Sequence, residues 1–161
     1  MAVWQEIAAF ATSKIISTEK LDIIIGNLNF LRTPARYFYE RLVADADYTT
    51  TSTTFVDIDA TNMVTTFTTY GNPVRISLRA RVISSTTGWC EIEFVVDGAA
   101  LSNDFAIGVH RQRADIDQGL NVERLVELAA GSHTFRAQWS TTAGTLTMDR
   151  DSVIQFEVVE T

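Results

Sequence analysis

The sequence predicts a mostly β protein, an antiparallel β-sandwich or jelly roll of about ten strands that follows an N-terminal helical segment. After Pro34 the chain is rich in threonine and alternates apolar with polar residues, which is the period of a half-buried strand. The alternating runs are short and separated by brief turns, a spacing typical of sandwiches and jelly rolls. We therefore expect a helical segment over residues 1–35 and a β-sandwich domain over residues 36–161.

The composition fits one domain with an appendage and narrows the classes of partner. A chain of 161 residues with 46% hydrophobic residues can build one proper core. The net charge of −7 opposes binding to nucleic-acid phosphates and to anionic membranes, so we expect neither partner. The first ten residues carry no basic residue, and no apolar run could span a bilayer. We therefore expect no signal peptide, no transmembrane helix, and synthesis in the cytosol.

The clearest helix signal lies just before Pro34. Thr18 suits the N-cap position, and Glu19 and Asp22 place negative charge in the first turn, where the helix dipole favours it. Because Pro34 prevents continuation, we expect a helix from about Glu19 to Leu31. Its apolar residues follow a heptad-like spacing of three, four and three at Leu21, Ile24, Leu28 and Leu31.

This helix has more apolar surface than it can bury by itself. Two interpretations remain open: the helix packs on its own β-domain, or it serves as a docking or trimerisation element. For the second interpretation the candidate oligomerisation and docking residues are Trp4, Ile7, Leu21, Ile24, Leu28 and Leu31.

Ten runs after the proline have the pattern expected of strands. They are Tyr37–Val43, Thr54–Ile58, Met63–Tyr70, Val74–Ile83, Trp89–Val96, Phe105–His110, Val122–Leu128, His133–Ser140, Thr145–Met148 and Ser152–Val159.

The stretch Val122–Trp139 consists of two alternating runs joined by a short turn at 129–132, and we expect it to form a β-hairpin. In its second run every other residue is apolar, as a half-buried antiparallel strand requires. The residues expected to face the core are Phe135, Ala137 and Trp139, and those expected to face outward are Thr134, Arg136 and Gln138.

The runs Val74–Val82 and Cys90–Val96 suggest a second hairpin with a defined register. That register would pair Arg81 with Glu91, Arg79 with Glu93 and Arg75 with Asp97 on one face. The other face would bury Val82 with Cys90, Ala80 with Ile92, Leu78 with Phe94 and Ile76 with Val96. The three arginines could form an anion-binding stripe, but their acidic partners favour solvated cross-strand ion pairs.

The sequence contains no constellation that indicates catalysis. Two histidines, His110 and His133, and the single Cys90 leave little from which to build a zinc site or a Cys–His pair. We expect Cys90 to face the core and His133 to cap or pack beside a turn. Phosphate-binding glycine loops and Gly-x-Ser-x-Gly elbows are also missing from the sequence. We therefore predict that the protein is not an enzyme and has no catalytic residues, no metal ligands and no cofactor.

Three residues form the candidate ligand surface. Trp89 follows a turn and should lie on the outer face, where an aromatic ring can bind a sugar or simply pack at the rim. Asp115 and Asp117 lie in a loop with oxygen ligands at alternate positions, but the loop lacks the glycine and the final glutamate of a calcium-binding EF-hand. Solvated surface acids explain these carboxylates better than calcium does.

Two stretches together resemble parts of known bacteriophage proteins. The first has an early Trp4, then Thr18-Glu19-Lys20-Leu21, then Gly26-Asn27-Leu28-Asn29-Phe30-Leu31 before Thr33-Pro34. It resembles the short helical leader of many bacteriophage structural proteins. The second runs Val126-Glu127-Leu128-Ala129-Ala130-Gly131-Ser132-His133-Thr134-Phe135, then Trp139, and closes with Ile154-Gln155-Phe156-Glu157-Val158. It resembles the end of the jelly-roll heads that such proteins carry, which are similar to the trimeric tumour-necrosis-factor-like fold.

The resemblance implies a non-enzymatic virion component, either a capsid-decorating protein or a tail-fibre head. Such a protein would be made in the host cytoplasm, attach through its N-terminal segment and form a homotrimer. Its partners would be itself and other capsid or tail proteins. The alternative is a lectin-like module that recognises a cell-surface glycan through Trp89 or the loop of Asp115 and Asp117.

Overall fold

The computed structural model of the protein describes residues 20–24, 37–42, 47–102, 106–151 and 154–161. A short helix spans residues 20–24, inside the stretch where the sequence predicts one. On it Leu21 is exposed and Ile24 is half-buried, whereas four other candidate docking residues lie outside the described residues: Trp4, Ile7, Leu28 and Leu31. Within the described part of the chain, no helix is long and apolar enough to cross a membrane.

The mostly β prediction is confirmed. Each of the ten predicted runs overlaps a strand of the structure, and two further short strands, Tyr48–Thr50 and Ala99–Ala100, were not predicted. The strands are β1 (Tyr37–Leu42), β2 (Tyr48–Thr50), β3 (Val56–Asp57), β4 (Val64–Tyr70), β5 (Pro73–Ser84), β6 (Gly88–Val96), β7 (Ala99–Ala100), β8 (Gly108–Gln112), β9 (Gln118–Glu127), β10 (Ala130–Thr141), β11 (Leu146–Met148) and β12 (Ile154–Glu160).

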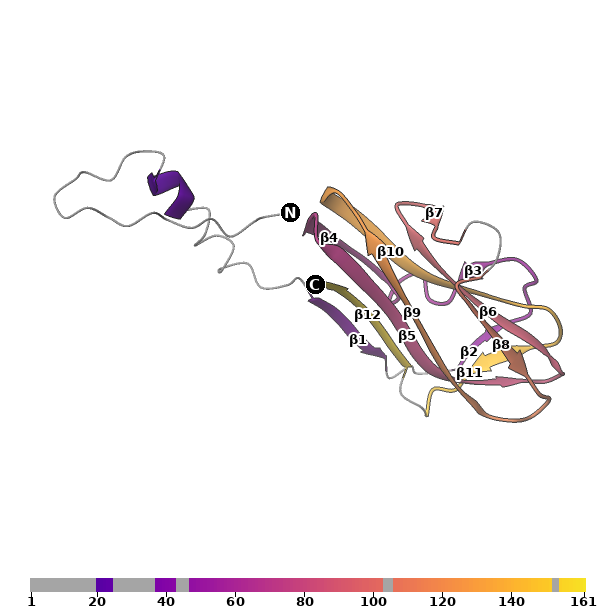
Figure 1. The fold of residues 1–161 in the computed structure, drawn as a ribbon. Coiled ribbons are helices and arrows are strands. Elements are labelled where there is room, and N and C mark those ends of the chain that lie inside the picture. The colour runs from indigo at the N-terminus through magenta and orange to yellow at the C-terminus, as the bar shows by residue number, and fades with distance from the viewer. Residues whose placement is uncertain (1–19, 25–36, 43–46, 103–105, 152–153) are drawn as a thin grey trace.

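The strands form two antiparallel sheets that pack face to face (Figure 1). We name each sheet after a central strand. In the β5 sheet the order is β1, β12, β5, β11 and β2, and β9 pairs with the free edge of β5. In the β6 sheet the order is β3, β10, β6 and β7, with β4 on the edge of β10 and β8 on the edge of β6.

Several short strands are pieces of one longer strand. At the end of β1 Leu42 lies opposite Ile154, and at the start of β2 Tyr48 lies opposite Met148. The two paired segments therefore each advance by six residues, so the register is kept. Thus β1 and β2 share one position, as do β11 and β12. In the other sheet β3 and β4 share an edge of β10, and β7 and β8 share an edge of β6.

With these pieces joined, the sandwich has eight strand positions, four in each sheet. Numbered along the chain, the β5 sheet has the order 1, 8, 3, 6 and the β6 sheet the order 2, 7, 4, 5. Almost every connection therefore crosses from one sheet to the other. This arrangement of two four-stranded layers is a jelly roll.

The crossing connections show that both predicted hairpins are wrong. β5 and β6 lie in different sheets, and so do β9 and β10. Arg79 lies opposite Asn121 and Gln155 rather than Glu93, and Arg81 lies opposite Gly119 rather than Glu91. Arg75 likewise has Leu125 and Val159 as its neighbours instead of Asp97.

The length of the connections explains how the chain changes sheets. Only Leu128 and Ala129 separate β9 from β10, and residues 85–87 separate β5 from β6. Two intervening residues span roughly 10 Å between flanking Cα atoms, which matches the distance between packed sheets. A turn of this length can close a hairpin or cross the sandwich equally well.

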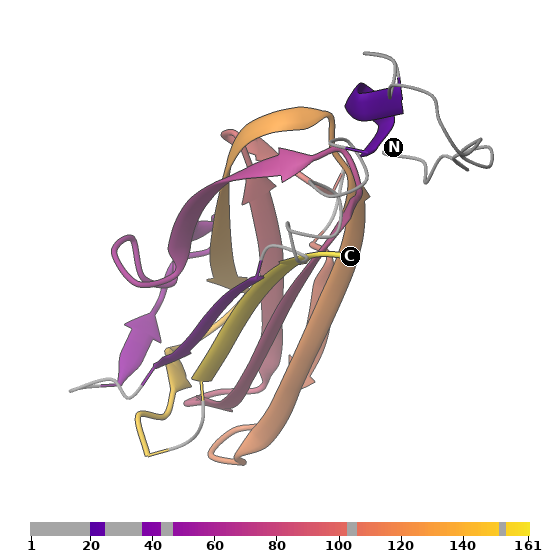
Figure 2. The same cartoon turned by 90° about the vertical axis from the view of Figure 1, so that its left-hand side faces the viewer.

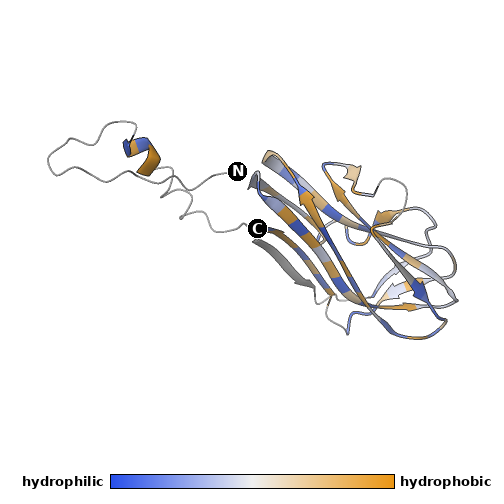
Figure 3. Ribbon diagram, viewed as in Figure 1, coloured by the Kyte–Doolittle hydropathy of each residue, from blue (hydrophilic) through white to orange (hydrophobic). Residues whose placement is uncertain are grey.

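The predicted core faces are confirmed although the pairing is wrong. Leu78 and Phe94 are both fully buried, but they approach from opposite sheets. The ring of Phe94 also lies 6.4 Å from that of Phe156 on β12, centroid to centroid, and so joins the two layers. Figure 3 shows the alternation of apolar and polar residues along the strands that makes this core possible. Each large side chain buried in this way contributes about 1.5–3 kcal/mol.

Cys90 faces the core, as the sequence predicts. Burial raises the pKa of the Cys90 thiol to about 12, and the neighbouring Glu91 acts in the same direction. The thiolate is the reactive form of cysteine, so this side chain is chemically inert at neutral pH. Cys90 serves as a small apolar residue of the core.

Candidate functional site

The sandwich has two distinct ends. β5 runs from one end to the other, and its twelve residues span roughly 35 Å. At the Ser84 end four turns meet, formed by residues 51–55, 85–87, 113–117 and 142–145; we call it the Trp89 end. At the Pro73 end lie the start of β1, the end of β12 and the turns around Gly71, Gly98 and Ala129; we call it the His133 end. The C-terminus marks the His133 end at the left of the sandwich in Figure 1.

Hydrogen bonds fix the turns of the Trp89 end to one another. The backbone N–H of Trp89 donates to Thr142 Oγ1 at 2.9 Å, and the N–H of Thr142 donates to the Trp89 carbonyl at 3.1 Å. The N–H of Asp115 donates to the Ser84 carbonyl at 2.8 Å. Trp89 itself stays 44% exposed, so its predicted place on the outer face is confirmed. The indole is held by a rigid backbone and presented to solvent.

The structure places Asp115 and Asp117 at the same end as Trp89, but the two carboxylates have different surroundings. Asp115 is exposed and has a left-handed backbone with φ of 55°. Asp117 is partly buried and forms an ion pair with Arg81. An oxygen already held by a guanidinium is a poor calcium ligand. Among the described residues, no three His, Cys, Asp or Glu side chains are grouped so that they could hold a metal ion.

Two of the three arginines on β5, Arg75 and Arg81, form ion pairs, although with other partners than the sequence suggests. Arg75 lies 3.4 Å from Glu123 and 3.3 Å from Glu157, nitrogen to oxygen, and Arg81 pairs with Asp117. These acids belong to the β5 sheet or to the loop that leads into it, whereas the expected acids belong to the β6 sheet. The stripe is therefore largely neutralised.

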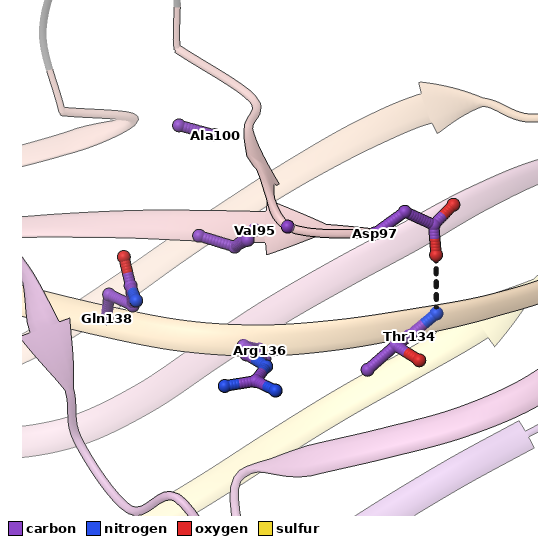
Figure 4. Close-up of a pocket in the computed structure, with 7 residues that line it drawn as sticks. Val95, Asp97, Ala100, Thr134, Arg136 and Gln138 are labelled. Atoms are coloured by element: carbon purple, nitrogen blue, oxygen red, sulfur yellow. Dashed lines mark hydrogen bonds between the residues drawn. The ribbon is translucent and has the colours of Figure 1, made fainter.

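A polar groove of about 630 Å³ lies on the outer face of the β6 sheet, near the His133 end (Figure 4). Its lining residues are Val95, Asp97, Gly98, Ala100, Thr134, Arg136 and Gln138. Arg136 and Gln138 both donate to Asp57, at 3.1 and 2.8 Å, and Asp97 accepts from the Thr134 N–H at 2.9 Å. Because these polar groups already satisfy one another, the groove offers few unsatisfied groups to a ligand.

This groove could not be predicted from the sequence because it depends on the pairing of β6 with β10. One local signal was readable: Asp97-Gly98 is a dipeptide typical of two-residue hairpin turns. Both residues have positive φ, 52° and 82°, and they connect β6 to the missed strand β7. Asp97 then reaches the side chain of His133 on β10.

His133 lies between two acceptors. Its Nδ1 is 2.7 Å from Asp97 Oδ2, and its Nε2 is 2.9 Å from the Ala129 carbonyl. The expectation that this histidine caps a turn is confirmed. The hydrogen bond with Asp97 is the main cause that raises the pKa of His133 above 6.5, and the Ala129 carbonyl adds to it. The same hydrogen bond with His133 is the first of the causes that lower the pKa of Asp97 below 3.8.

We expect the His133–Asp97 pair to stabilise the fold most in mildly acidic solution. The contribution of His133 to the free energy of unfolding is complete below pH 6.5 and is lost as the pH rises through its higher folded-state pKa. The contribution of Asp97 is complete above 3.8 and is lost as the pH falls through its lower folded-state pKa. The urea midpoint of the wild type should therefore be higher at pH 5.5 than at pH 8. In Asp97→Asn the difference between these two midpoints should be smaller. Equal pH dependence in the two proteins would contradict this account.

No protein-family model and no curated protein matches the sequence. Solved structures do match the fold. The capsid chain in T=1 particles derived from infectious bursal virus aligns with a TM-score of 0.53 and 8% sequence identity, over 78% of this chain and 31% of that chain. The corresponding chain of the Gx strain of infectious bursal disease virus gives a TM-score of 0.48 and 10% identity, over 79% and 33%.

A weaker match is the enzymatically active domain of tailspike protein 4 from bacteriophage CBA120, with a TM-score of 0.28 and 11% identity over 73% and 19% of the two chains. The chain thus spans about a third of the length of the capsid chains it matches. At 8% identity the likeness concerns the fold alone. The described sandwich has the fold of a viral capsid jelly-roll domain.

Proposed function

We propose that the protein is a non-enzymatic structural protein of a virus particle, either a capsid-decorating protein or a tail-fibre head of a bacteriophage. The observation that supports this most is the two-layered jelly-roll fold, which aligns with a capsid chain at a TM-score of 0.53. In this role its partners would be other capsid or tail proteins, and its place would be the virion.

The two ends of the sandwich suggest a division of labour. The chain enters β1 at the His133 end, where Tyr37 lies opposite Val159, and Figure 2 shows β1 and β12 side by side there. The N-terminal segment therefore joins the sandwich at the end opposite Trp89. We propose that residues 1–35 attach the protein to the particle and hold three copies together, while the Trp89 end faces outward.

The described contacts support this assignment. The core cluster of the described residues is drawn from the sandwich alone and includes none of residues 20–24. Leu21 remains 46% exposed. An apolar helix residue without a place in the core of its own domain is suited to a partner surface.

The mass of the full chain in solution and its position in the particle test the proposal. Light scattering should give three times the monomer mass, and electron microscopy of assembled particles should place the sandwich on the capsid surface or on the tail. A monodisperse monomer would contradict the homotrimer. Absence of the protein from purified particles would contradict the virion role.

The alternative function is a lectin-like module that recognises a glycan of the host surface. The exposed Trp89, held by hydrogen-bonded turns at the end opposite the N-terminal segment, is the observation that favours it. Binding of the full chain to a glycan array would support this function, and a protein that only decorates the particle should bind no glycan there.

A further inference from the structure

The exposed arginines of the chain are not equally neutralised. In the described part of the chain the side chains of Arg75, Arg81 and Arg136 each contact a carboxylate, whereas the guanidinium groups of Arg111 and Arg113 form no hydrogen bond or ion pair. Both of these residues are exposed, in a chain whose net charge is −7. Two unneutralised guanidinium groups close together are a natural site for an anion.

The strand pairing places the two arginines on one surface with Trp89. Arg111 lies directly opposite Trp89 in the pairing of β6 with β8, so their Cβ atoms are roughly 5 Å apart. Arg113 follows two residues later, while Gln112 between them is fully buried. Arg111 therefore shares the outer face with Trp89, and Arg113, the first residue after β8, is exposed as well.

A hollow of about 620 Å³ lies at this surface, lined by Thr87, Arg111, Arg113 and Ala114. This volume is in the range of sites that hold small organic ligands, roughly 300–1,000 Å³. The hollow is open to solvent, and Arg111 in its lining lies opposite Trp89 in the strand pairing. Its walls come from the turn before β6 and from the end of β8, which the hydrogen bonds of Trp89 and Asp115 hold in place. Little ordering would be needed on binding.

From this geometry we propose that the Trp89 end carries a binding site for an acidic saccharide, that is, a sugar with a carboxylate or a sulfate group. Arg111 and Arg113 bind the anionic group, the indole of Trp89 packs against the apolar face of the sugar ring, and Thr87 supplies a hydroxyl for hydrogen bonding. The inference deepens the glycan-binding alternative and rests on it, but it does not depend on how the N-terminal segment attaches.

The charge of the whole chain argues for a small acidic sugar over a polyanion. A nucleic acid or an anionic membrane would bring many negative charges close to a protein that is itself negative, and two arginines cannot compensate for them. A single carboxylate or sulfate needs only local positive charge. The aromatic ring next to the cations adds a contact that a free inorganic anion cannot use.

Calorimetric titration of the full chain with three probes tests the site: sialyllactose, a sulfated disaccharide and neutral lactose. We expect the acidic probes to bind and lactose to bind at least about tenfold more weakly. The double variant Arg111→Gln/Arg113→Gln should weaken acidic binding about tenfold or more and should make it insensitive to salt. Trp89→Ala should weaken binding of the same probes.

The matched control is Arg79→Gln, which removes another exposed arginine, one that forms no ion pair with the described residues, from the outer face of the β5 sheet. It should change affinity less than about twofold. Thermal melting of every variant verifies that it is folded. Preference for sialyllactose or for the sulfated probe identifies the anionic group. Equal binding of all three probes would overturn the acidic site and leave the glycan-binding function standing, whereas no binding of any probe would overturn both.

Discussion

Replacing Glu93 with alanine should lower the free energy of unfolding by about 3–5 kcal/mol, a large effect for one residue on the outer face of a sheet. Glu93 is only 1% exposed, because the segment after β7 covers it. Its carboxylate accepts hydrogen bonds from the backbone N–H groups of Phe94, Leu101 and Ser102, at 2.9, 3.2 and 3.3 Å. It also accepts one from the Ser102 hydroxyl.

The cost arises from the donors that remain after the substitution. The N–H of Leu101 keeps a second acceptor, the Phe94 carbonyl at 2.9 Å. The N–H and hydroxyl of the half-buried Ser102 are bound to the carboxylate, and a donor that is buried without a partner costs about 1–3 kcal/mol. Urea unfolding at a fixed protein concentration measures the loss, because association would otherwise contribute to the apparent stability.

Glu123→Ala is the matched control. Glu123 lies on β9 with a side chain that is 54% exposed, and among the described residues its carboxylate contacts only Arg75, at the long distance of 3.4 Å. Removing an exposed partner of this kind should change the free energy of unfolding by less than about 1 kcal/mol. If Glu93→Ala costs no more than Glu123→Ala, the covering segment does not depend on the carboxylate.

Glu93 illustrates what the pattern of a strand can and cannot predict. Alternation along Trp89–Val96 correctly places Cys90 and Phe94 toward the core and Glu93 on the other face. The pattern contains no information about what covers that other face. A polar residue there was therefore expected in solvent, beside Arg79, and is instead buried under a loop that follows it in the chain.

The two predicted hairpins are wrong for a related reason. Both Leu78 and Phe94 had to face the core, and this holds whether β5 and β6 pair side by side or face each other across the sandwich. A consistent register between two runs is thus compatible with either arrangement when the turn is short. Choosing between them requires the neighbours on the far edges, here β9 and β12 for β5, which come from distant parts of the sequence.

The candidate ligand surface was predictable only in part. Trp89 follows a turn and alternates with core residues, so its exposure could be inferred. Arg111 and Arg113 are visible in the sequence as two arginines separated by one residue. The position of Arg111 opposite Trp89, however, depends on the pairing of β6 with β8. Such non-local pairing brings the residues of a site together without leaving a motif.

Deleting residues 1–33 should abolish the homotrimer while the sandwich stays soluble and unfolds with nearly the same midpoint. The candidate docking residues all lie in the deleted part, and the core cluster of the described residues does not include the helix at 20–24. The opposite result is expected if the helix completes one end of the core. Burial of Leu21, Ile24 and Leu28 would then contribute about 1.5–3 kcal/mol each, a large share of the ~5–15 kcal/mol that stabilises a typical domain.

Two substitutions in the full chain separate these outcomes from a general effect of shortening. Leu21→Asp, at an exposed helix position, should reduce the mass measured by light scattering from trimer toward monomer and leave the unfolding midpoint unchanged. Leu125→Asp, at a leucine of β9 that is 59% exposed, is the matched control and should leave the trimer intact. If Leu125→Asp loses the trimer and Leu21→Asp does not, the trimer interface lies on the sandwich. A truncated protein that aggregates or loses most of its stability would show that the segment belongs to the core, because a domain whose own residues complete its core needs no N-terminal helix to remain folded.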